Sequence, residues 1–328
     1  MATYKGIQGF AIQDLSSDPT TFITGQVWYN STSNIFRVTT GTTVSNAAWA
    51  TGGNLNTGRQ QAAAGGTQTA GLGFGGNNPG AGTTQLNVTE EYNGSSWTNG
   101  GNLTTARNFL AGGGTQTAGL AFGGQNGGSG GYLAATEEYG GTSWTNGGNL
   151  NQGRNVLSGC GTQTAGLAFG GSNPSNPYSK LTEEYDGSSW TASGNMNTGR
   201  ARMGGVGIQT SALGFGGYNP NFDAVEEFNG STWTTVTALP SAKQMISGSG
   251  VDNTSVVAFG GEPTTNAAII YNGTAWTTTA SMGTARYATG GAGSSTAGLA
   301  FGGGPGTKNN TEEFTGAVVA IETITTTD

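Results

Sequence analysis

The sequence is built from one pattern of residues that occurs six times, and this repetition limits the possible folds more than any other feature. Each copy has a Trp, a Leu or Met six residues later, and a Lys or Arg ten residues after the Trp. A Phe-Gly-Gly follows the cation by fifteen or sixteen residues, and an aromatic residue stands five residues before the next Trp. The tryptophans are Trp49, Trp97, Trp144, Trp190, Trp233 and Trp276, and the cations are Arg59, Arg107, Arg154, Arg200, Lys243 and Arg286. A period of about 42 to 48 residues indicates one supersecondary unit that is stacked several times.

Four short segments of each repeat are predicted to be β-strands. In the second repeat they are NFLAGGG, AGLAFGG, ATEEYG and SSWTNG, which contain apolar or aromatic residues between Gly, Asn and Ser turn residues. Almost every spacing within the repeat is fixed. The distance from Phe-Gly-Gly to the next aromatic is the exception, since it falls from 18 to 12 residues along the chain. That segment is therefore predicted to be a loop between the second and third strands.

An apolar run closed by Gly-Gly, then an aromatic, then a Trp with a downstream Arg resembles the kelch repeat, over about residues 47–316. The resemblance implies an all-β fold, a six-bladed β-propeller with four-stranded blades. The last repeat lacks its own Trp strand, so we expect the Trp49 strand to complete it beside Glu312, Glu313 and Phe314. The paired glycines are expected to let backbones approach closely near the axis.

The repeat boundaries divide the chain into three expected parts. Residues 1–46 form an attachment segment with a β-hairpin at 25–39, residues 47–316 form the propeller, and residues 317–328 form a C-terminal strand or tail. The tail AVVAIETITT also has strand character. A seventh, three-stranded blade built from both termini is therefore the alternative architecture.

The composition argues against several classes of function. The chain has 63 Gly, only 9% charged residues, a net charge of −7 and no basic cluster, so we expect no nucleic-acid partner. It has no His, which removes Ser-His-Asp chemistry and the copper site of those kelch propellers that are oxidases. Cys160 is the single cysteine and is expected to be a small residue of an inner strand. We expect no metal, no cofactor, no signal peptide and no membrane insertion.

Ten of the eighteen acidic residues fall in Glu-Glu pairs that occupy the same place in five repeats. The pairs are Glu90-Glu91, Glu137-Glu138, Glu183-Glu184, Glu226-Glu227 and Glu312-Glu313. We predict that one Glu of each pair faces the repeated cation in a partly buried ion pair. The fifth repeat supports this pairing because it has Ile269-Ile270 for the acids and Lys243 for Arg. A glycan-acting enzyme would need a nonrepeated acid pair instead. The propeller's candidates for that pair are Asp186, Asp223, Asp252 and Glu262.

The variable loops are the segments where recognition is expected, because they differ on a frame that repeats. Aromatic rings there can stack on sugars, and amides or ammonium groups can bind hydroxyls. The candidate ligand-binding residues are Asn77, Asn78, Tyr132, Tyr178, Tyr218, Asn219, Phe222 and Lys308.

The segment GQVWYNSTSNIFRV resembles hairpins found near the start of bacteriophage tail-fibre and other virion proteins. The resemblance implies a multicopy or homo-oligomeric virion protein, assembled in the host cytoplasm and attached to other virion proteins through its N-terminal segment. We expect no catalysis, and a propeller loop face that binds a host-surface glycan or protein. A purely structural decoration or connector without receptor binding is the first alternative, and a glycan-acting enzyme is the second.

Overall fold

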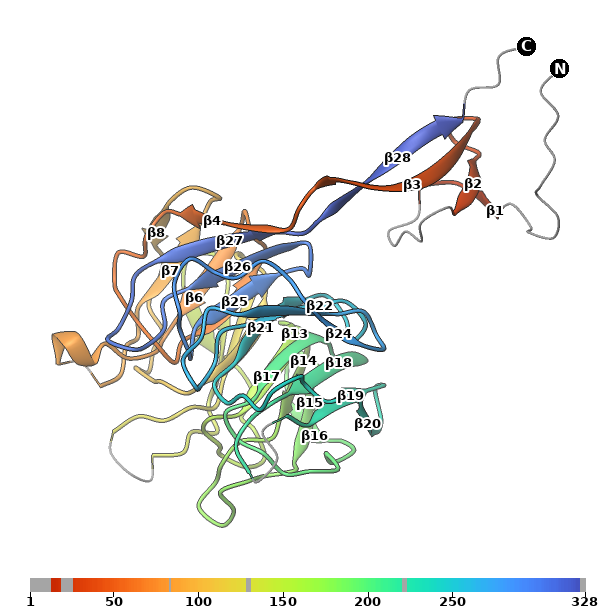
Figure 1. Cartoon of the computed structure of the whole chain (residues 1–328). Helices are drawn as coiled ribbons and strands as arrows, with labels where there is room; N and C mark the ends of the chain where they lie inside the picture. Colours follow the sequence, from red (N-terminus) through yellow and green to blue (C-terminus); the bar gives the residue numbers. More distant parts are fainter. Residues whose placement is uncertain (1–12, 19–25, 83, 128–130, 220–222, 325–328) are drawn as a thin grey trace, which may run out of the picture. The chain divides into compact units, whose positions relative to one another are not determined.

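The computed structural model describes residues 13–18, 26–82, 84–127, 131–219 and 223–324, and its regular structure is almost entirely β-strand (Figure 1). Within these ranges the strands form seven four-stranded sheets, and one 3-10 helix, η1 (Pro79–Ala81), interrupts a loop. The chain divides into two compact units. We call Ala48–Thr315 the ring unit, and Met1–Ala47 with Gly316–Asp328 the terminal unit. The expected all-β class is confirmed.

Six of the seven sheets belong to the ring unit, and we number them along the chain. Each of the first five is an antiparallel meander of four consecutive strands, as the repeat predicted. Sheets 1 to 3 are β5 (Ala63–Gly66), β6 (Gly71–Phe74), β7 (Thr89–Tyr92) and β8 (Trp97–Asn99); β9 (Ala111–Gly114), β10 (Gly119–Phe122), β11 (Thr136–Tyr139) and β12 (Trp144–Asn146); and β13 (Ser158–Thr162), β14 (Ala165–Phe169), β15 (Thr182–Tyr185) and β16 (Trp190–Ala192). Sheets 4 and 5 are β17 (Gly204–Ile208), β18 (Ser211–Phe215), β19 (Val225–Phe228) and β20 (Trp233–Val236); and β21 (Ser247–Gly250), β22 (Val256–Phe259), β23 (Ala268–Tyr271) and β24 (Trp276–Thr278).

Sheet 6 combines the two ends of the ring unit. Its first three strands are β25 (Gly290–Gly293), β26 (Ala297–Phe301) and β27 (Thr311–Thr315), and its outer strand is β4 (Ala48–Gly52). β4 pairs antiparallel with β27 and places Trp49 opposite Phe314. The prediction that the Trp49 strand completes the last repeat is confirmed.

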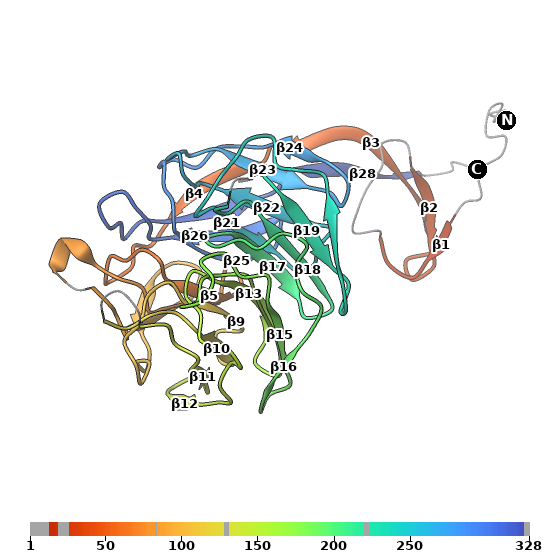
Figure 2. The ribbon, with the colours of Figure 1, turned by 90° about the horizontal axis from the view of Figure 1, so that it is seen from below.

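The first strands of the six sheets lie around a common centre (Figure 2). They contact one another in the order β5, β9, β13, β17, β21 and β25, and β25 contacts β5. Next to them, six backbone N–H···O=C bonds of 2.8–3.1 Å form a closed circuit that links each repeat to the next. The donors and acceptors are, in order, Phe109 to Gln61, Val156 to Phe109, Arg202 to Val156, Met245 to Arg202, Ala288 to Met245 and Gln61 to Ala288. Four-stranded sheets arranged around a central channel are typical of a β-propeller.

Glycine is required where the first strands crowd together and where each second strand ends. A Cβ built on Gly113 would lie 2.7 Å from the carbonyl oxygen of Gly161 in the next sheet. Gly75, which follows Phe74, has a φ of +65°, and its Cβ would lie 2.9 Å from the carbonyl oxygen of Arg107. The expected close approach of backbones at the paired glycines is confirmed.

The apolar core lies between neighbouring sheets. Each second strand is buried along most of its length, because sheets cover it on both sides. Phe74 of sheet 1 packs against Trp144 of sheet 2 with ring centroids 4.9 Å apart, and Phe122 of sheet 2 packs against Trp190 of sheet 3 at 4.8 Å. The repeated Phe and Trp therefore bind successive sheets to one another.

The terminal unit contains the seventh sheet, whose order is β1 (Gln13–Leu15), β2 (Val27–Asn30), β3 (Ile35–Ser45) and β28 (Val318–Ile324). β2 and β3 form the hairpin that the sequence predicted at 25–39. The sheet draws on both termini, as the alternative architecture expected, but its three-strand count is wrong because β1 adds a fourth strand parallel to β2.

Candidate functional site

The repeated Arg and the first Glu of each pair form a buried ion pair inside five of the six ring sheets. Arg107 Nη2 donates to Glu137 Oε1, and the other four N···O distances are 2.5–3.0 Å. The four pairs with these distances are Arg59–Glu90, Arg154–Glu183, Arg200–Glu226 and Arg286–Glu312. Burial lowers the pKa of each guanidinium, and the carboxylate opposes that shift. The predicted pairing is confirmed, but the arginines are fully rather than partly buried.

Each of these arginines also binds backbone carbonyls of its own sheet. Arg154 Nη1 donates to the carbonyl oxygens of Gly170 and Leu181, at 2.9 Å each. The carboxylate of Glu183 in turn accepts the backbone N–H of Asn151 at 2.7 Å. Gly170 follows the second strand and Leu181 precedes the third strand. The guanidinium thus joins the two ends of the loop between these strands. These carboxylates are part of the frame, which argues against their use as acid and base.

The second Glu of the pair bridges to the next sheet, a contact that sequence reasoning missed. Tyrosine hydroxyls donate to these carboxylates at 2.5–3.0 Å, in the pairs Tyr92–Glu313, Tyr139–Glu91, Tyr185–Glu138 and Tyr271–Glu227. Burial, together with the carboxylate bond, raises the pKa of each tyrosine to about 12.

A change at two positions in the sequence could have revealed this bridge. A Cβ on Gly100 would lie 2.5 Å from the Tyr139 hydroxyl, so glycine leaves room for the hydroxyl at this junction. Tyr271 bonds Glu227 at the longer distance of 3.0 Å, with Val236 at the equivalent place. Between sheets 3 and 4 the residue equivalent to Gly100 is Ser193. The aromatic residue that faces it is Phe228, which has no hydroxyl. Ser193 Oγ donates to Glu184 at 2.6 Å and replaces the missing tyrosine.

Tryptophan and glutamine side chains complete the bonds between sheets. In four sheets the indole N–H donates to the Thr that precedes the Glu pair in the preceding sheet, at 2.8–2.9 Å. Gln116 is one of four glutamines whose Nε2 donates to two carbonyl oxygens of the preceding sheet, here Gly71 and Tyr92. The repeated Arg, Glu, Tyr, Trp and Gln side chains named above are thus engaged in the frame, whereas the side chain of the repeated cation Lys243 has no such bond to a described residue.

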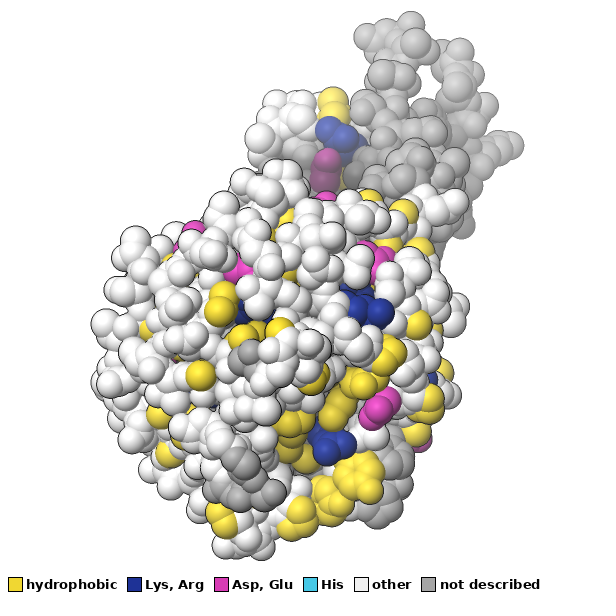
Figure 3. Space-filling view, turned by 90° about the vertical axis from the view of Figure 1, so that its left-hand side faces the viewer, with side chains coloured by type: hydrophobic (Ala, Val, Ile, Leu, Met, Phe, Trp, Pro, Cys, Tyr) yellow, Lys and Arg dark blue, Asp and Glu magenta, His cyan; other side chains and the backbone are white. Residues whose placement is uncertain are grey.

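Each sheet has two ends. The turns that join the first strand to the second and the third strand to the fourth lie at one end, and the variable residues lie at the other end. The loops between second and third strands pack there against the connections that enter each sheet. Gln60 pairs with Asn77 through a two-way backbone bridge, and Arg107 N–H donates to the Leu86 carbonyl at 3.0 Å. We call this set of loops and connections the loop face. Figure 3 views the side that carries η1, where hydrophobic side chains gather beside Lys or Arg.

Several of the predicted ligand-binding residues have structural contacts on this face. Asn78 Oδ1 caps η1 by accepting the Ala81 N–H at 3.1 Å, and half-buried Tyr132 forms a backbone bridge with Gln125. The backbone of Lys308 receives the N–H of Arg59 at 3.0 Å. Asn77 is half-buried and its Oδ1 has no hydrogen-bond partner among the described residues. Phe222 lies outside the described residues.

Two of the predicted residues come together with a third that the sequence did not single out. The rings of Tyr178, from the loop of sheet 3, and Tyr218, from the loop of sheet 4, have centroids 5.7 Å apart. The guanidinium carbon of Arg202 lies 5.9 Å from the centre of the Tyr218 ring. Asn219 Nδ2 donates to the Gly199 carbonyl at 2.7 Å and so fixes the chain beside Tyr218. We call Tyr178, Tyr218 and Arg202 the aromatic cluster.

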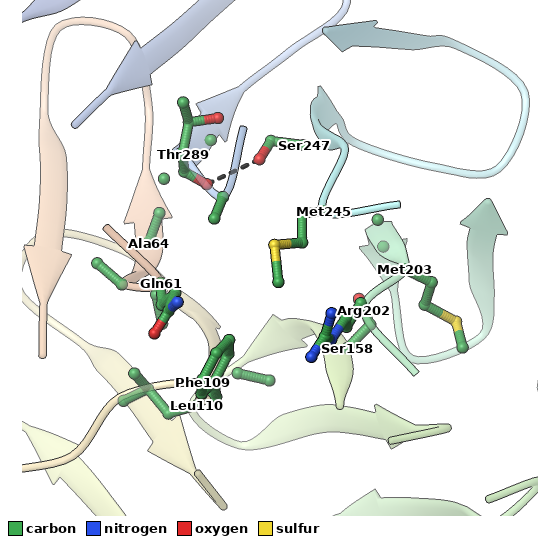
Figure 4. Close-up of a pocket in the computed structure, with 18 of the residues that line it drawn as sticks. Gln61, Ala64, Phe109, Leu110, Ser158, Arg202, Met203, Met245, Ser247 and Thr289 are labelled. Atoms are coloured by element: carbon green, nitrogen blue, oxygen red, sulfur yellow. Dashed lines mark hydrogen bonds between the residues drawn. The ribbon is translucent and has the colours of Figure 1, made fainter. Parts of the chain in front are cut away.

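A cavity of about 160 Å³ opens at the centre of the ring unit, and Arg202 also lines it (Figure 4). Its mouth carries one residue from each repeat, two positions after the repeated cation. These residues are Gln61, Phe109, Val156, Arg202, Met245 and Ala288, and all have φ between +45° and +58°. The left-handed backbone costs free energy for residues other than glycine, and the hydrogen-bond circuit holds it in place. Six unlike side chains therefore stand at equivalent, fixed positions.

The remaining acidic candidates do not line the central cavity or a second cavity beside it, where no described residue of the lining is Asp or Glu. Asp186 and Asp252 accept backbone N–H bonds within tight turns at the end away from the loop face. Asp223 and Glu262 lie on the loop face. Cys160 is a buried residue of the inner strand β13, as expected, and burial raises its pKa to about 12.

Comparison with known proteins adds no family to this geometry. No protein-family model matches the chain, and a search of curated proteins gives no match. Within the described ranges, no three His, Cys, Asp or Glu side chains are grouped so that they could hold a metal ion. No described helix has the length and apolar character needed to cross a membrane.

Proposed function

We propose that the ring unit is a six-bladed kelch-type β-propeller that binds a ligand through its loop face. The kelch-like repeat, the six four-stranded sheets and the closed hydrogen-bond circuit support this architecture. One observation carries the binding function: the Arg, Glu and Tyr side chains shared by the repeats bind one another, whereas variable side chains, including exposed Tyr218 and Arg202, gather on one face. A rigid frame with variable loops is suited to recognition.

The protein is proposed to be a bacteriophage virion component, such as a tail fibre, that contacts a glycan or protein on the host surface. The resemblance of residues 25–39 to virion hairpins supports this location, and that segment forms the β2–β3 hairpin of the terminal unit. The terminal unit is then the part that attaches to other virion proteins, in several copies per particle. Catalysis is not part of the proposal, and the paired Glu residues are assigned to the frame because they bind Arg and Tyr.

Binding of labelled, purified protein to envelopes of candidate bacterial hosts tests this function. The native protein is expected to bind saturably, with soluble surface polysaccharide as a competitor. A Tyr178→Ala/Tyr218→Ala variant is expected to bind at least about tenfold more weakly. Ile208→Ala/Val251→Ala is the matched control, since it removes exposed apolar side chains from the turns at the other end of the sheets.

The alternative of a virion decoration without receptor binding predicts a different result. No saturable binding to the envelope of any host that propagates the source phage would favour that alternative. Equal losses in the two double variants would show that exposed apolar surface in general, rather than the loop face, causes the binding.

A further inference from the structure

The cations of the ring unit that form no ion pair are confined to the loop face. Five of its nine Lys and Arg residues are the buried arginines of the frame. The other four lie in loops or connections of the loop face, and none forms an ion pair with a described residue. These four are Lys180, Arg202, Lys243 and Lys308. The same face has two carboxylates outside the frame, Asp223 and Glu262.

The acidic overall charge of the chain therefore does not extend to this face. The net charge of −7 includes the Glu residues whose carboxylates bind Arg and Tyr within the frame. Asp186 and Asp252 add negative charge at the turns of the other end. Excess positive charge on one face attracts anions and raises their rate of association.

Arg202 is the one of these cations that combines a fixed backbone with an exposed guanidinium. Its backbone N–H donates to Val156, and its carbonyl accepts the N–H of Met245, so the hydrogen-bond circuit holds it on both sides. Its side chain is exposed, with Nη1 3.5 Å from Gln244 Oε1 at the limit of a hydrogen bond. A guanidinium has five N–H donors, so most of them are available to a carboxylate or phosphate.

The neighbouring tyrosines supply a surface for the rest of such a ligand. Tyr218 is 41% exposed and stands between Tyr178 and Arg202. Tilted aromatic rings of this kind can pack against the C–H face of a pyranose while the guanidinium binds its acidic group. Exposed Lys180 follows Tyr178 by two residues and packs beside Gly199, so a second cation lies in the same sector.

From this placement we propose that the aromatic cluster binds an anionic sugar, with Arg202 on the acidic group, Tyr178 and Tyr218 on the ring, and Lys180 as the second cation. The inference rests on the proposed function and specifies its ligand as a glycan that carries carboxylate or phosphate groups. Arg202 is thus a specificity-determining residue for that ligand.

Affinity measurements with three immobilised polymers test the inference. They are polygalacturonate, the same polymer after chemical reduction of its carboxyl groups, and a poly(N-acetylglucosamine 1-phosphate) wall polymer, which keeps the pyranose ring and carries phosphate instead of carboxylate. Native protein is expected to bind the carboxylate polymer, the phosphate polymer or both, and to lose at least about tenfold in affinity on the reduced polymer. Which anionic polymer is bound identifies the acidic group.

Two variants with the same change in charge provide the comparison. Arg202→Gln places at sheet 4 the residue that Gln61 provides at the equivalent position, so the fold is preserved. Its affinity for the bound polymer is expected to fall at least about tenfold. Lys243→Gln removes one charge from the connection entering the next sheet and is expected to lower affinity less than about twofold.

Three results would overturn the inference: no binding to either anionic polymer, an affinity for the reduced polymer equal to that for the anionic polymer that is bound, or equal losses in Arg202→Gln and Lys243→Gln. In each case the proposed function would still be supported if envelope binding were saturable and depended on Tyr178 and Tyr218. The failure of the anionic ligand is therefore distinguishable from the failure of the proposed function.

Discussion

Replacing Arg154 by Met tests whether the buried ion pairs hold the ring unit together. The substitution keeps an unbranched apolar side chain but removes the guanidinium that binds Glu183 at 2.8 Å and the carbonyls of Gly170 and Leu181. The Glu183 carboxylate would then be buried with only the backbone and side-chain amide of Asn151 as donors. Removing one partner of a buried ion pair costs about 3–5 kcal/mol, because the other charge is left uncompensated.

The expected loss in stability corresponds to a Tm lowered by roughly 5–10 °C for a unit of this length. Thermal and chemical unfolding followed by tryptophan fluorescence and circular dichroism would measure it. Lys243→Met is the matched control. Lys243 occupies the same position in the fifth repeat and is half-buried, and that repeat has Ile269 in place of the Glu that would pair with it. Its cost is expected to be below about 1 kcal/mol.

A double variant separates the unpaired charge from the lost packing. Arg154→Met/Glu183→Gln removes both charges and is expected to recover about half of the stability lost in the single variant, or more. Equal costs for Arg154→Met and Lys243→Met would refute the role given to the ion pairs. A double variant no more stable than Arg154→Met would show that the unpaired carboxylate is not the cause.

Three further predictions concern the tyrosine bridges between sheets. Tyr139→Phe removes only the hydroxyl that donates to Glu91 and is expected to cost about 1–3 kcal/mol in chemical denaturation. Phe228→Tyr is expected to lower the Tm because the Ser193 side chain stands where the new hydroxyl would go, and adding Ser193→Gly should restore it. Alkaline pH should also destabilise the protein. The bridging tyrosines have pKa values raised to about 12, so their contribution is complete below about pH 10 and is lost as the pH rises through 12.

Each of these predictions has a clear contrary result. An unchanged unfolding midpoint for Tyr139→Phe would mean that the short contact with Glu91 adds no stability. A Phe228→Tyr protein as stable as the native one would remove the steric explanation for Ser193. Denaturation midpoints that agree at pH 9 and pH 11.5 would argue against proton linkage through tyrosine.

The repeat made the main features of the ring unit predictable from sequence. Fixed spacing located the strands, and the missing Trp strand of the last repeat implied that β4 pairs with β27. The Arg–Glu pairing was predictable because Lys243 and Ile269 change together in the fifth repeat. In each case a local rule was tested six times within one chain.

Contacts between sheets were harder to predict, because spacing within a repeat does not say which neighbour a side chain meets. The Tyr139–Glu91 bridge joins two repeats, and its signal lies in changes that span a junction, such as Ser193 with Phe228 and Ile270 with Phe314. Arg202 was missed because its position holds a different residue in every repeat. The strand β1 was missed because three residues are too short to show periodicity.

The pairing of β4 with β27 also determines how the ring unit can transmit force. Ala48 lies opposite Thr315, so the chain enters and leaves this unit side by side, and both covalent connections continue into the terminal unit. A pull on the terminal unit is therefore shared by two backbones that belong to the same sheet. Tension would draw both strands the same way instead of peeling one from the other. The proposed role in attachment to a host cell would benefit from that doubled tether.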